Sequence, residues 1–404
     1  MNFIGGGVCA AKGFLANGIH CGIRKNKAKR DLSMIYSTVP ANAAAVYTTN
    51  LVKGAPITVT KEHLKDGKAQ AVICNSGNAN TCNADGIEIA NKVSKLAADA
   101  LGLTPEDIVI ASTGVIGLPM EIAPFASGIP ALVGGLAENN SEAAAEGIMT
   151  TDTQMKQVAV SFEIDGKECR IGGIAKGSGM IHPNMATMLV FITTDCAISS
   201  QMLQKALSTD IQSTFNMLSV DGDTSTNDMV TVLANGLAGN KEITEEDENF
   251  AKFMIALNTV NVYLCRHIAA DGEGATKLIE CRVCGAGSDT CAKAVAKSVV
   301  CSSLTKAAMF GSDANWGRVL CAIGYSGQDV NVNKIDVAFK SAKGTIDVCK
   351  NGSGIEFSED LAKEILLENE IEILVNLNDG EYYSVAWGCD LTYDYVRING
   401  DYRS

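Results

Sequence analysis

The chain is poor in basic residues, and this scarcity excludes the function classes that depend on a positively charged surface. Lys and Arg number 33 against 46 Asp and Glu, which leaves a formal net charge of −13. The densest basic run, residues 24–30, is short, and we interpret it as a solvated loop. Because nucleic-acid-binding proteins carry larger basic patches that neutralise phosphates, we expect no nucleic-acid partner.

Long apolar runs are also missing. No segment approaches the roughly 18 uninterrupted apolar residues of a membrane span, so we expect no membrane partner. The N-terminus, Met1-Asn-Phe-Ile-Gly-Gly-Gly7, has neither a basic region nor a compact apolar stretch, so we expect no signal peptide. With 404 residues, 47% of them hydrophobic, the chain has material for a large core, in one domain or in two closely packed ones.

The 14 cysteines do not form a regularly spaced framework. In a chain of this length, scattered cysteines indicate reduced, buried thiols and a cytoplasmic location. Cys281 and Cys284, with Cys291 further on, are followed by no second close pair and by no histidines at zinc-ligand spacing. We therefore interpret the pair as two thiols on a strand and expect no metal.

Helix and strand patterns are mixed along the chain. Composition and spacing predict core strands at residues 44–50, 71–74, 108–111 and 188–194, a helix over 85–101, and a long amphipathic helix opened by the acidic run 245–248. A second helix-start signature lies at 104–107. Residues 371–377 and 381–387 flank Asn378-Asp379-Gly380, a pattern that predicts a β-hairpin.

The most informative segment is a glycine-rich loop that leads into a buried strand, Lys176-Gly-Ser-Gly-Met-Ile-His-Pro-Asn-Met-Ala-Thr-Met-Leu189. Thr187 stands where the loop meets the strand, so its rotamer would be fixed while its front stays open. A threonine hydroxyl is a weak nucleophile unless a base lies beside it, and a free α-amine on the same residue is such a base. The chain would first have to cleave between Ala186 and Thr187. From these cues alone, a turn followed by an ordinary core strand remains the alternative.

Further polar loops carry candidate site residues. Thr113 and Gly114 follow a predicted strand and present a hydroxyl and an unencumbered backbone N–H together, as an oxyanion requires, although an ordinary turn is the alternative. Glu273 lies between two glycines that would expose its carboxylate to a substrate ammonium group. Residues 219–228 lack the spacing and terminal glutamate of an EF-hand, so we interpret them as a polar active-site loop or a cap network.

The segment from Lys176 to Leu189 resembles the cleavage motif of the ornithine acetyltransferase (glutamate N-acetyltransferase) family of arginine biosynthesis. Further matching motifs follow in the family's order over essentially the whole chain. The resemblance implies an α/β (α+β) fold of sheets packed with helices, related to the β-peptidyl aminopeptidase fold. It also implies autocleavage into residues 1–186 and 187–404, which stay associated, as a heterotetramer of two cleaved pairs.

The same resemblance assigns roles to single residues. It implies that Thr187 is the nucleophile and that Thr113 and Gly114 form the oxyanion hole. The substrate contacts that it implies are Thr153, Lys176, Thr187, Glu273, Asn399 and Ser404, although the family more often ends in threonine than in serine. The implied reaction moves acetyl from N2-acetylornithine to glutamate through an acetyl-threonine. No step requires a cofactor, and acetyl-CoA remains open as a second acetyl donor.

Two other function classes remain open. An N-terminal-threonine amidase or aminopeptidase would share the nucleophile and the cleavage, but water would resolve its acyl-enzyme. A non-catalytic small-molecule-binding protein, for example one that holds phosphate on residues 176–179, would have an intact chain. That loop lacks the order of a P-loop because its lysine precedes the glycines.

Overall fold

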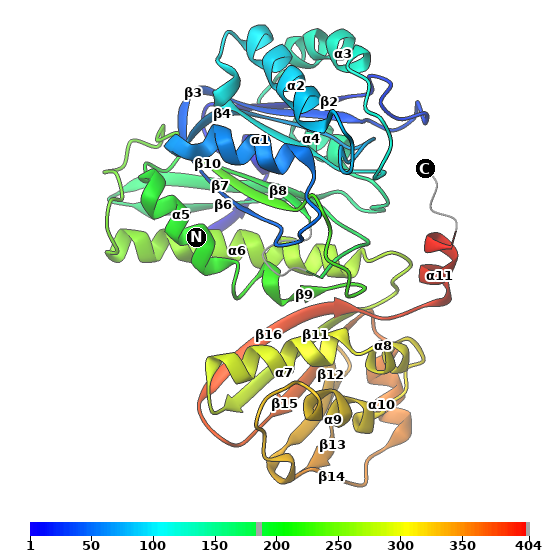
Figure 1. Ribbon diagram of the computed structural model, residues 1–404. Helices are drawn as coiled ribbons and strands as arrows, with labels where there is room; N and C mark the ends of the chain where they lie inside the picture. The colour runs from blue at the N-terminus through cyan, green and yellow to red at the C-terminus, as the bar shows by residue number, and fades with distance from the viewer. Residues whose placement is uncertain (183–187, 401–404) are drawn as a thin grey trace.

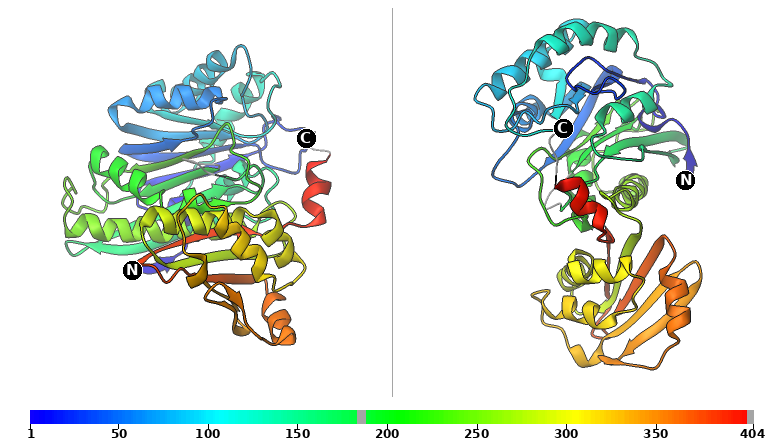
Figure 2. Two further views of the ribbon diagram at one scale, coloured as in Figure 1. Left: turned by 60° about the horizontal axis from the view of Figure 1, so that its bottom comes forward. Right: turned by 90° about the vertical axis from the view of Figure 1, so that its right-hand side faces the viewer.

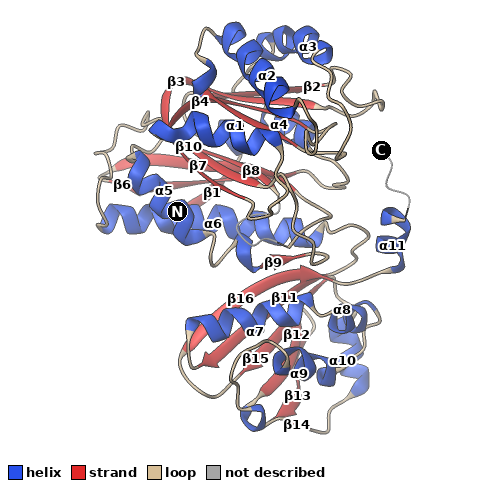
Figure 3. Ribbon diagram, in the orientation of Figure 1, coloured by secondary structure: helices blue, strands red, loops and turns tan. Residues whose placement is uncertain are grey.

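The computed structural model describes residues 1–182 and 188–400, which form a larger and a smaller lobe (Figure 1). Among these residues a nine-stranded sheet builds the larger lobe and a seven-stranded sheet builds the smaller one. Helices pack on both sheets (Figure 3). The prediction of an α/β (α+β) fold is confirmed.

The larger sheet has the order β1-β6-β7-β8-β10-β3-β4-β5, with β2 paired to β3. Its strands are β1 (Asn2–Ile4), β2 (Phe14–Ile19), β3 (Leu32–Tyr47), β4 (Lys68–Asn75), β5 (Ile108–Ser112), β6 (Lys156–Ile164), β7 (Lys167–Lys176), β8 (Leu189–Thr194) and β10 (Met229–Ala234). The smaller sheet has the order β14-β13-β12-β15-β11-β16-β9. Its strands are β9 (Leu218–Ser219), β11 (Leu278–Ala286), β12 (Asp336–Ser341), β13 (Gly344–Lys350), β14 (Ser353–Gly354), β15 (Glu370–Asn376) and β16 (Tyr382–Cys389).

The helices of the larger lobe are α1 (Ala55–His63), α2 (Gly86–Leu101), α3 (Ala123–Gly134), α4 (Ser141–Ile148), α5 (Ser200–Asp210) and α6 (Glu248–Ala270). Those that follow are α7 (Asp289–Cys301), α8 (Ser303–Phe310), α9 (Trp316–Gly324), α10 (Glu359–Leu366) and α11 (Tyr393–Asn399). The predicted strands correspond to β3, β4, β5 and β8, and the predicted helices to α2 and α6. The signature at 104–107 forms only one 3₁₀ turn, Pro105–Asp107, closed by a capping box.

Strand β3 connects the two parts of the larger sheet. Its first part pairs with β2 and β4 and its last part with β10, and its register against β4 shifts between Tyr36 and Ala41. Pro40 lies inside this shift, where its missing N–H costs no regular ladder bond. One apolar core lies on the side of β8 and β10 that holds Leu189 and Met229, and a second lies on their other side, under α5 and α6.

The two predicted fragments share one sheet. Strands β8 and β10 follow residue 187 in the chain, yet they lie between β7 and β3, which precede it. Strand β8 is antiparallel to β7 and parallel to β10, so both of its edges are hydrogen-bonded. Pulling the fragments apart would expose strand edges and apolar core together.

The predicted hairpin is wrong. Strand β11 lies between the two segments, parallel to β15 and antiparallel to β16. The turn at 378–380 crosses the end of β11, where Leu377 N–H donates to Cys284 O at 3.0 Å and Asp379 N–H to Gly285 O at 2.7 Å. The turn residues 378–380 fit this wider connection as well as they would fit a hairpin. The local sequence pattern contains no sign of β11, which lies between the two strands.

Several further features bear on the class of protein. No helix within residues 1–182 and 188–400 is long and apolar enough to cross a bilayer. In the same ranges, no cluster of three or more His, Cys, Asp or Glu side chains is arranged to hold a metal ion. Cys281 is buried and Cys284 is exposed, and both are free thiols, like the other cysteines.

Helix α6 offers a test of the core beneath the larger sheet. The Phe253 side chain is fully buried there, and removing an aromatic ring from such a core costs about 3–5 kcal/mol. We expect Phe253→Ala to lower the free energy of unfolding by that amount in urea titrations. Ile255, on the same helix, is 59% exposed, so Ile255→Ala should change the free energy of unfolding by less than about 0.5 kcal/mol. Equal losses in both variants would contradict this packing.

Candidate active site

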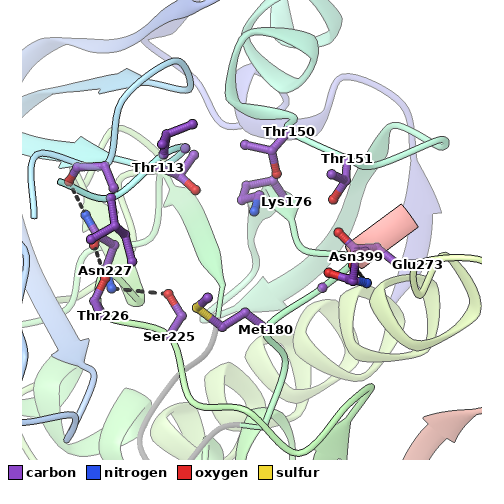
Figure 4. Close-up of a pocket in the computed structure, with 15 residues that line it drawn as sticks. Thr113, Thr150, Thr151, Lys176, Met180, Ser225, Thr226, Asn227, Glu273 and Asn399 are labelled. Atoms are coloured by element: carbon purple, nitrogen blue, oxygen red, sulfur yellow. Dashed lines mark hydrogen bonds between the residues drawn. The ribbon is translucent and has the colours of Figure 1, made fainter. Parts of the chain in front are cut away.

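A cavity of about 330 Å³ lies in the larger lobe at the ends of several strands. It is lined by Ala79, Thr113, Gly114, Val115, Ile116, Thr150, Thr151, Lys176, Gly179, Met180, Ser225, Thr226, Asn227, Glu273 and Asn399. Figure 4 shows the lining side chains converging from loops that are far apart in the sequence. Five of the residues predicted for the site are therefore brought together: Thr113, Gly114, Lys176, Glu273 and Asn399.

Lys176, the last residue of β7, supplies a buried cation to this cavity. Its side chain is only 8% exposed. Within residues 1–182 and 188–400, no hydrogen bond or ion pair to its ammonium group is found, although Asp152 and Asp228 lie close enough to interact electrostatically. A buried charge is costly unless it is paired. The cavity is therefore suited to a ligand with a negative group at this end.

Glu273 supplies a carboxylate on another wall of the cavity. It follows α6, and its own N–H donates to Ser178 O at 2.9 Å. Asn399 of α11 donates its side-chain N–H to the Glu273 carboxylate at 2.7 Å. Figure 2 shows α11 reaching from the smaller lobe back to the larger one. A Cβ on Gly179 would come within 2.3 Å of the Glu273 carboxyl group, so a larger residue there would displace the Glu273 side chain.

Thr113 and Gly114 line the cavity at the end of β5. The Thr113 backbone N–H is already donated to Asn75 O at 2.9 Å, which leaves its hydroxyl for the cavity. Gly114 has a φ of +129°, and a Cβ there would lie 2.8 Å from the Asn78 nitrogen. Its own N–H has no acceptor within the described part of the chain. The pair thus offers a hydroxyl and a backbone N–H to a ligand oxygen, as an oxyanion hole requires.

Asn227 was not among the predicted site residues, although its segment, 219–228, was interpreted as a polar loop. Its side-chain nitrogen donates to Ala79 O at 2.6 Å and to Ser112 O at 2.9 Å. Its oxygen accepts hydrogen bonds from the hydroxyls of Thr81 and Thr226, each at 2.6 Å. All the hydrogen-bonding groups of its side chain are used, so Asn227 fixes Ser112, the residue before Thr113, to the opposite loop. Local sequence shows a polar turn but not these distant partners.

Thr153 does not line the cavity, whereas Thr150 and Thr151 do. The Thr153 hydroxyl and N–H both donate to the Asp271 carboxylate. The threonines of this segment that line the cavity are therefore Thr150 and Thr151, which precede Thr153 in the chain. Direct substrate contact by Thr153 stays a prediction.

Three predicted residues, Ala186, Thr187 and Ser404, lie outside the described residues. The chain on either side of residues 183–187 is anchored. The His182 carbonyl accepts a hydrogen bond from the Thr224 hydroxyl at 2.8 Å, and the Met188 carbonyl accepts one from Met229 N–H at 2.9 Å. Burial, aided by the charge of Lys297, lowers the pKa of His182 to about 4. His182 is therefore neutral at physiological pH.

Two buried carboxyl groups near Lys176 have pKa values that are shifted in opposite directions. Burial disfavours the charged form of Asp152, but the charges of Lys156 and Lys176 outweigh it and hold the pKa of Asp152 below its ordinary value. Burial raises the pKa of Asp228 well above its ordinary value, although Ser225 and the charge of Lys176 act against this shift. One of its oxygens has no hydrogen-bond partner within the described residues. Lys176 therefore lies near one carboxyl group that favours its charged form, Asp152, and one that favours its neutral form, Asp228.

One small cavity thus combines a buried cation, an opposing carboxylate and a turn that offers a hydroxyl and a backbone N–H, which are groups suited to an enzyme that transfers an acyl group between amino acids. Comparison with known proteins agrees with this class. The chain matches the ArgJ family over residues 15–404. It therefore belongs to that family, and it is an acetyltransferase of arginine biosynthesis.

Individual relatives extend the match over the whole chain. The arginine biosynthesis bifunctional protein ArgJ of Caldanaerobacter subterraneus subsp. tengcongensis is 50% identical, with 100% of both chains covered. That of Streptococcus mutans serotype c is 48% identical, again over 100% of both chains. A crystal structure of the Bacillus halodurans protein is 51% identical with a TM-score of 0.50, and the match covers 52% of this chain and 97% of that chain.

The Gly114 turn offers a direct test of the site. We expect Gly114→Ala to lower kcat for acyl transfer by about 100-fold or more, because a displaced N–H loses the stabilisation that one oxyanion donor provides. Steady-state kinetics measure the effect. Gly134, in α3, has no positive φ and open space where a Cβ would lie, so Gly134→Ala should keep full activity. A Gly114→Ala enzyme with wild-type kcat would remove this turn from the mechanism.

Proposed function

We propose that the protein transfers the acetyl group of N2-acetylornithine to glutamate through an acetyl ester on Thr187. The observation that carries this proposal is the pairing of Lys176 and Glu273 in one cavity. The buried ammonium suits the α-carboxylate that both substrates share. The carboxylate suits the side-chain ammonium that only ornithine carries.

The chemistry is a two-step acyl transfer. The Thr187 hydroxyl attacks the acetyl carbonyl of N2-acetylornithine while the α-amine of the same residue accepts its proton and passes it to the leaving amine. Thr113 and Gly114 stabilise the tetrahedral oxyanion. Ornithine departs, and the amine of glutamate attacks the acetyl-threonine to give N-acetylglutamate and the free hydroxyl.

This mechanism requires a free α-amine on Thr187, and therefore cleavage between Ala186 and Thr187. Three observations support it. The fragments 1–186 and 187–404 share one sheet, so they can stay associated after cleavage. The Bacillus halodurans chain corresponds to about half of this one, as a single fragment would. The loop before the cleavage point carries Gly177 and Gly179, and glycine tolerates backbone conformations that other residues avoid. Assembly into a heterotetramer of two cleaved pairs is our further proposal, and light scattering on the purified protein tests it.

No step of this mechanism needs a cofactor. Acetyl-CoA is proposed as a second donor to the same threonine, and the word "bifunctional" in the names of the relatives motivates its inclusion in the assay. The free cysteines are consistent with a reducing compartment, and we place the enzyme in the cytoplasm. An amidase with the same nucleophile would instead release free acetate without glutamate.

Intact mass tests the cleavage. We expect the wild-type protein to give two fragments, the second beginning with Thr187, and Thr187→Ala to give one uncut, inactive chain, because alanine has no hydroxyl to attack the Ala186 carbonyl. Mass spectrometry with N-terminal sequencing measures both. An uncut wild-type chain with full transfer activity would contradict the mechanism.

The charge of Glu273 tests the substrate assignment. A hydrogen bond between charged groups contributes about 1.5–3 kcal/mol, so we expect Glu273→Gln to raise KM for N2-acetylornithine by about 10- to 150-fold. KM for glutamate should stay within about threefold, since glutamate has no cationic side chain to lose a partner. An equal rise in KM for both substrates would argue against the assignment.

A further inference from the structure

A fully buried ion cluster lies behind the walls of the cavity. The Lys156 ammonium, at the start of β6, contacts Asp152 at 2.7 Å and Asp271 at 2.5 Å. The exposed fractions of the three side chains are 0%, 0% and 4%. None of the three lines the cavity, so the cluster touches no substrate directly.

Each carboxylate of this cluster holds a different cavity segment. Asp152 accepts a hydrogen bond from Gly177 N–H at 2.7 Å, directly after Lys176. Asp271 accepts hydrogen bonds from Thr153 N–H at 3.1 Å and Gln154 N–H at 3.2 Å. Thr153 and Gln154 come shortly after Thr150 and Thr151, which line the cavity.

The backbone of Asp271 adds a third connection. Its carbonyl accepts a hydrogen bond from the Ser178 hydroxyl at 2.7 Å, and two residues later Glu273 N–H donates to Ser178 O. Segments 150–154, 176–178 and 271–273 are therefore joined through one lysine and two aspartates. These segments carry the cation, the carboxylate and two of the threonines of the cavity.

A cluster of this kind favours one arrangement over its alternatives. Every carboxylate oxygen that Lys156 contacts also accepts a backbone N–H, so a shift of any one segment would leave a buried charge without its partners. Such a loss is strongly unfavourable in a buried environment. Replacing a single member should therefore loosen all three segments together.

We propose that Lys156, Asp152 and Asp271 form a positioning clamp that sets the separation of Lys176 and Glu273, and so the length of amino acid that the cavity accepts. This proposal rests on the proposed function of the cavity. Thr153 belongs to the clamp, because the hydrogen of its hydroxyl is donated to Asp271. A role for Thr153 in substrate binding then acts through Asp271.

Asp271→Asn tests the clamp, with Asp210→Asn as the matched control. Asp210 is equally buried and accepts hydrogen bonds from Asn258 and Asn261, but it joins α5 to α6 away from the cavity. We expect both variants to lose thermal stability. Only Asp271→Asn should raise KM for N2-acetylornithine, by about tenfold or more with kcat little changed, because misplaced binding groups lose much of their effect.

Thr153 provides a milder test that avoids a buried charge. We expect Thr153→Val to raise KM as Asp271→Asn does, and Thr153→Ser to restore it, because serine keeps the hydroxyl that Asp271 accepts. Hydrogen exchange supplies a readout that does not depend on activity. In Asp271→Asn, the amides of residues 176–180 should exchange faster than in the wild type, although the substitution lies on another segment.

The outcomes separate the clamp from the proposed function. Unchanged KM and unchanged exchange at 176–180 in Asp271→Asn would overturn the clamp, whatever the loss of stability. A wild-type enzyme without acetyl transfer would overturn the proposed function, and the exchange measurement would still decide whether the clamp exists. An equal rise in KM for Asp210→Asn would show a general effect of destabilisation and would also overturn the clamp.

Discussion

The structure depends on the insertion of β8 between β7 and β10. Both edges of β8 are hydrogen-bonded, and its side chains enter the cores on both faces of the sheet. This pairing fixes Met188, the residue after Thr187, at the start of a central strand of the larger sheet. The glycine-rich loop is therefore tied at one end to β7, through Lys176, and at the other to β8. A candidate nucleophile next to such a strand can be positioned firmly even when the bond before it is cut.

The cavity is assembled from loops that each depend on a different part of the sheet. The turn with Thr113 and Gly114 follows β5, Lys176 ends β7, and the polar loop with Asn227 precedes β10. Asn227 links this loop to the residue before Thr113, and the ion cluster around Lys156 links the remaining walls. The rigidity of the site thus comes from buried polar contacts between loops as well as from the strands beneath them. Such contacts are costly to leave unsatisfied, which favours a single geometry.

The fold is compatible with the proposed cleavage between residues 186 and 187. The boundary between residues 186 and 187 does not coincide with the division between lobes. In the chain it falls between β7 and β8, which are neighbouring strands of the larger sheet. Cleavage there, as proposed, would create a new α-amine without separating the fragments, because strands from both fragments share one sheet and its cores.

The sequence by itself determined the local elements and most of the chemistry of this protein. Apolar periodicity located β4, β5, β8, α2 and α6, because burial on one face leaves a pattern within a few residues. The glycine-rich motif and its resemblance to a family indicated Thr113, Lys176, Glu273 and Asn399. Tertiary structure alone decided which strands became neighbours. The residues 378–380 suggested a hairpin, but β11 lies between the two strands, since pairing depends on a segment that lies far away in the chain. The roles of Asn227 and Lys156 were likewise hidden, because a hydrogen bond between distant loops leaves no periodic trace in the chain.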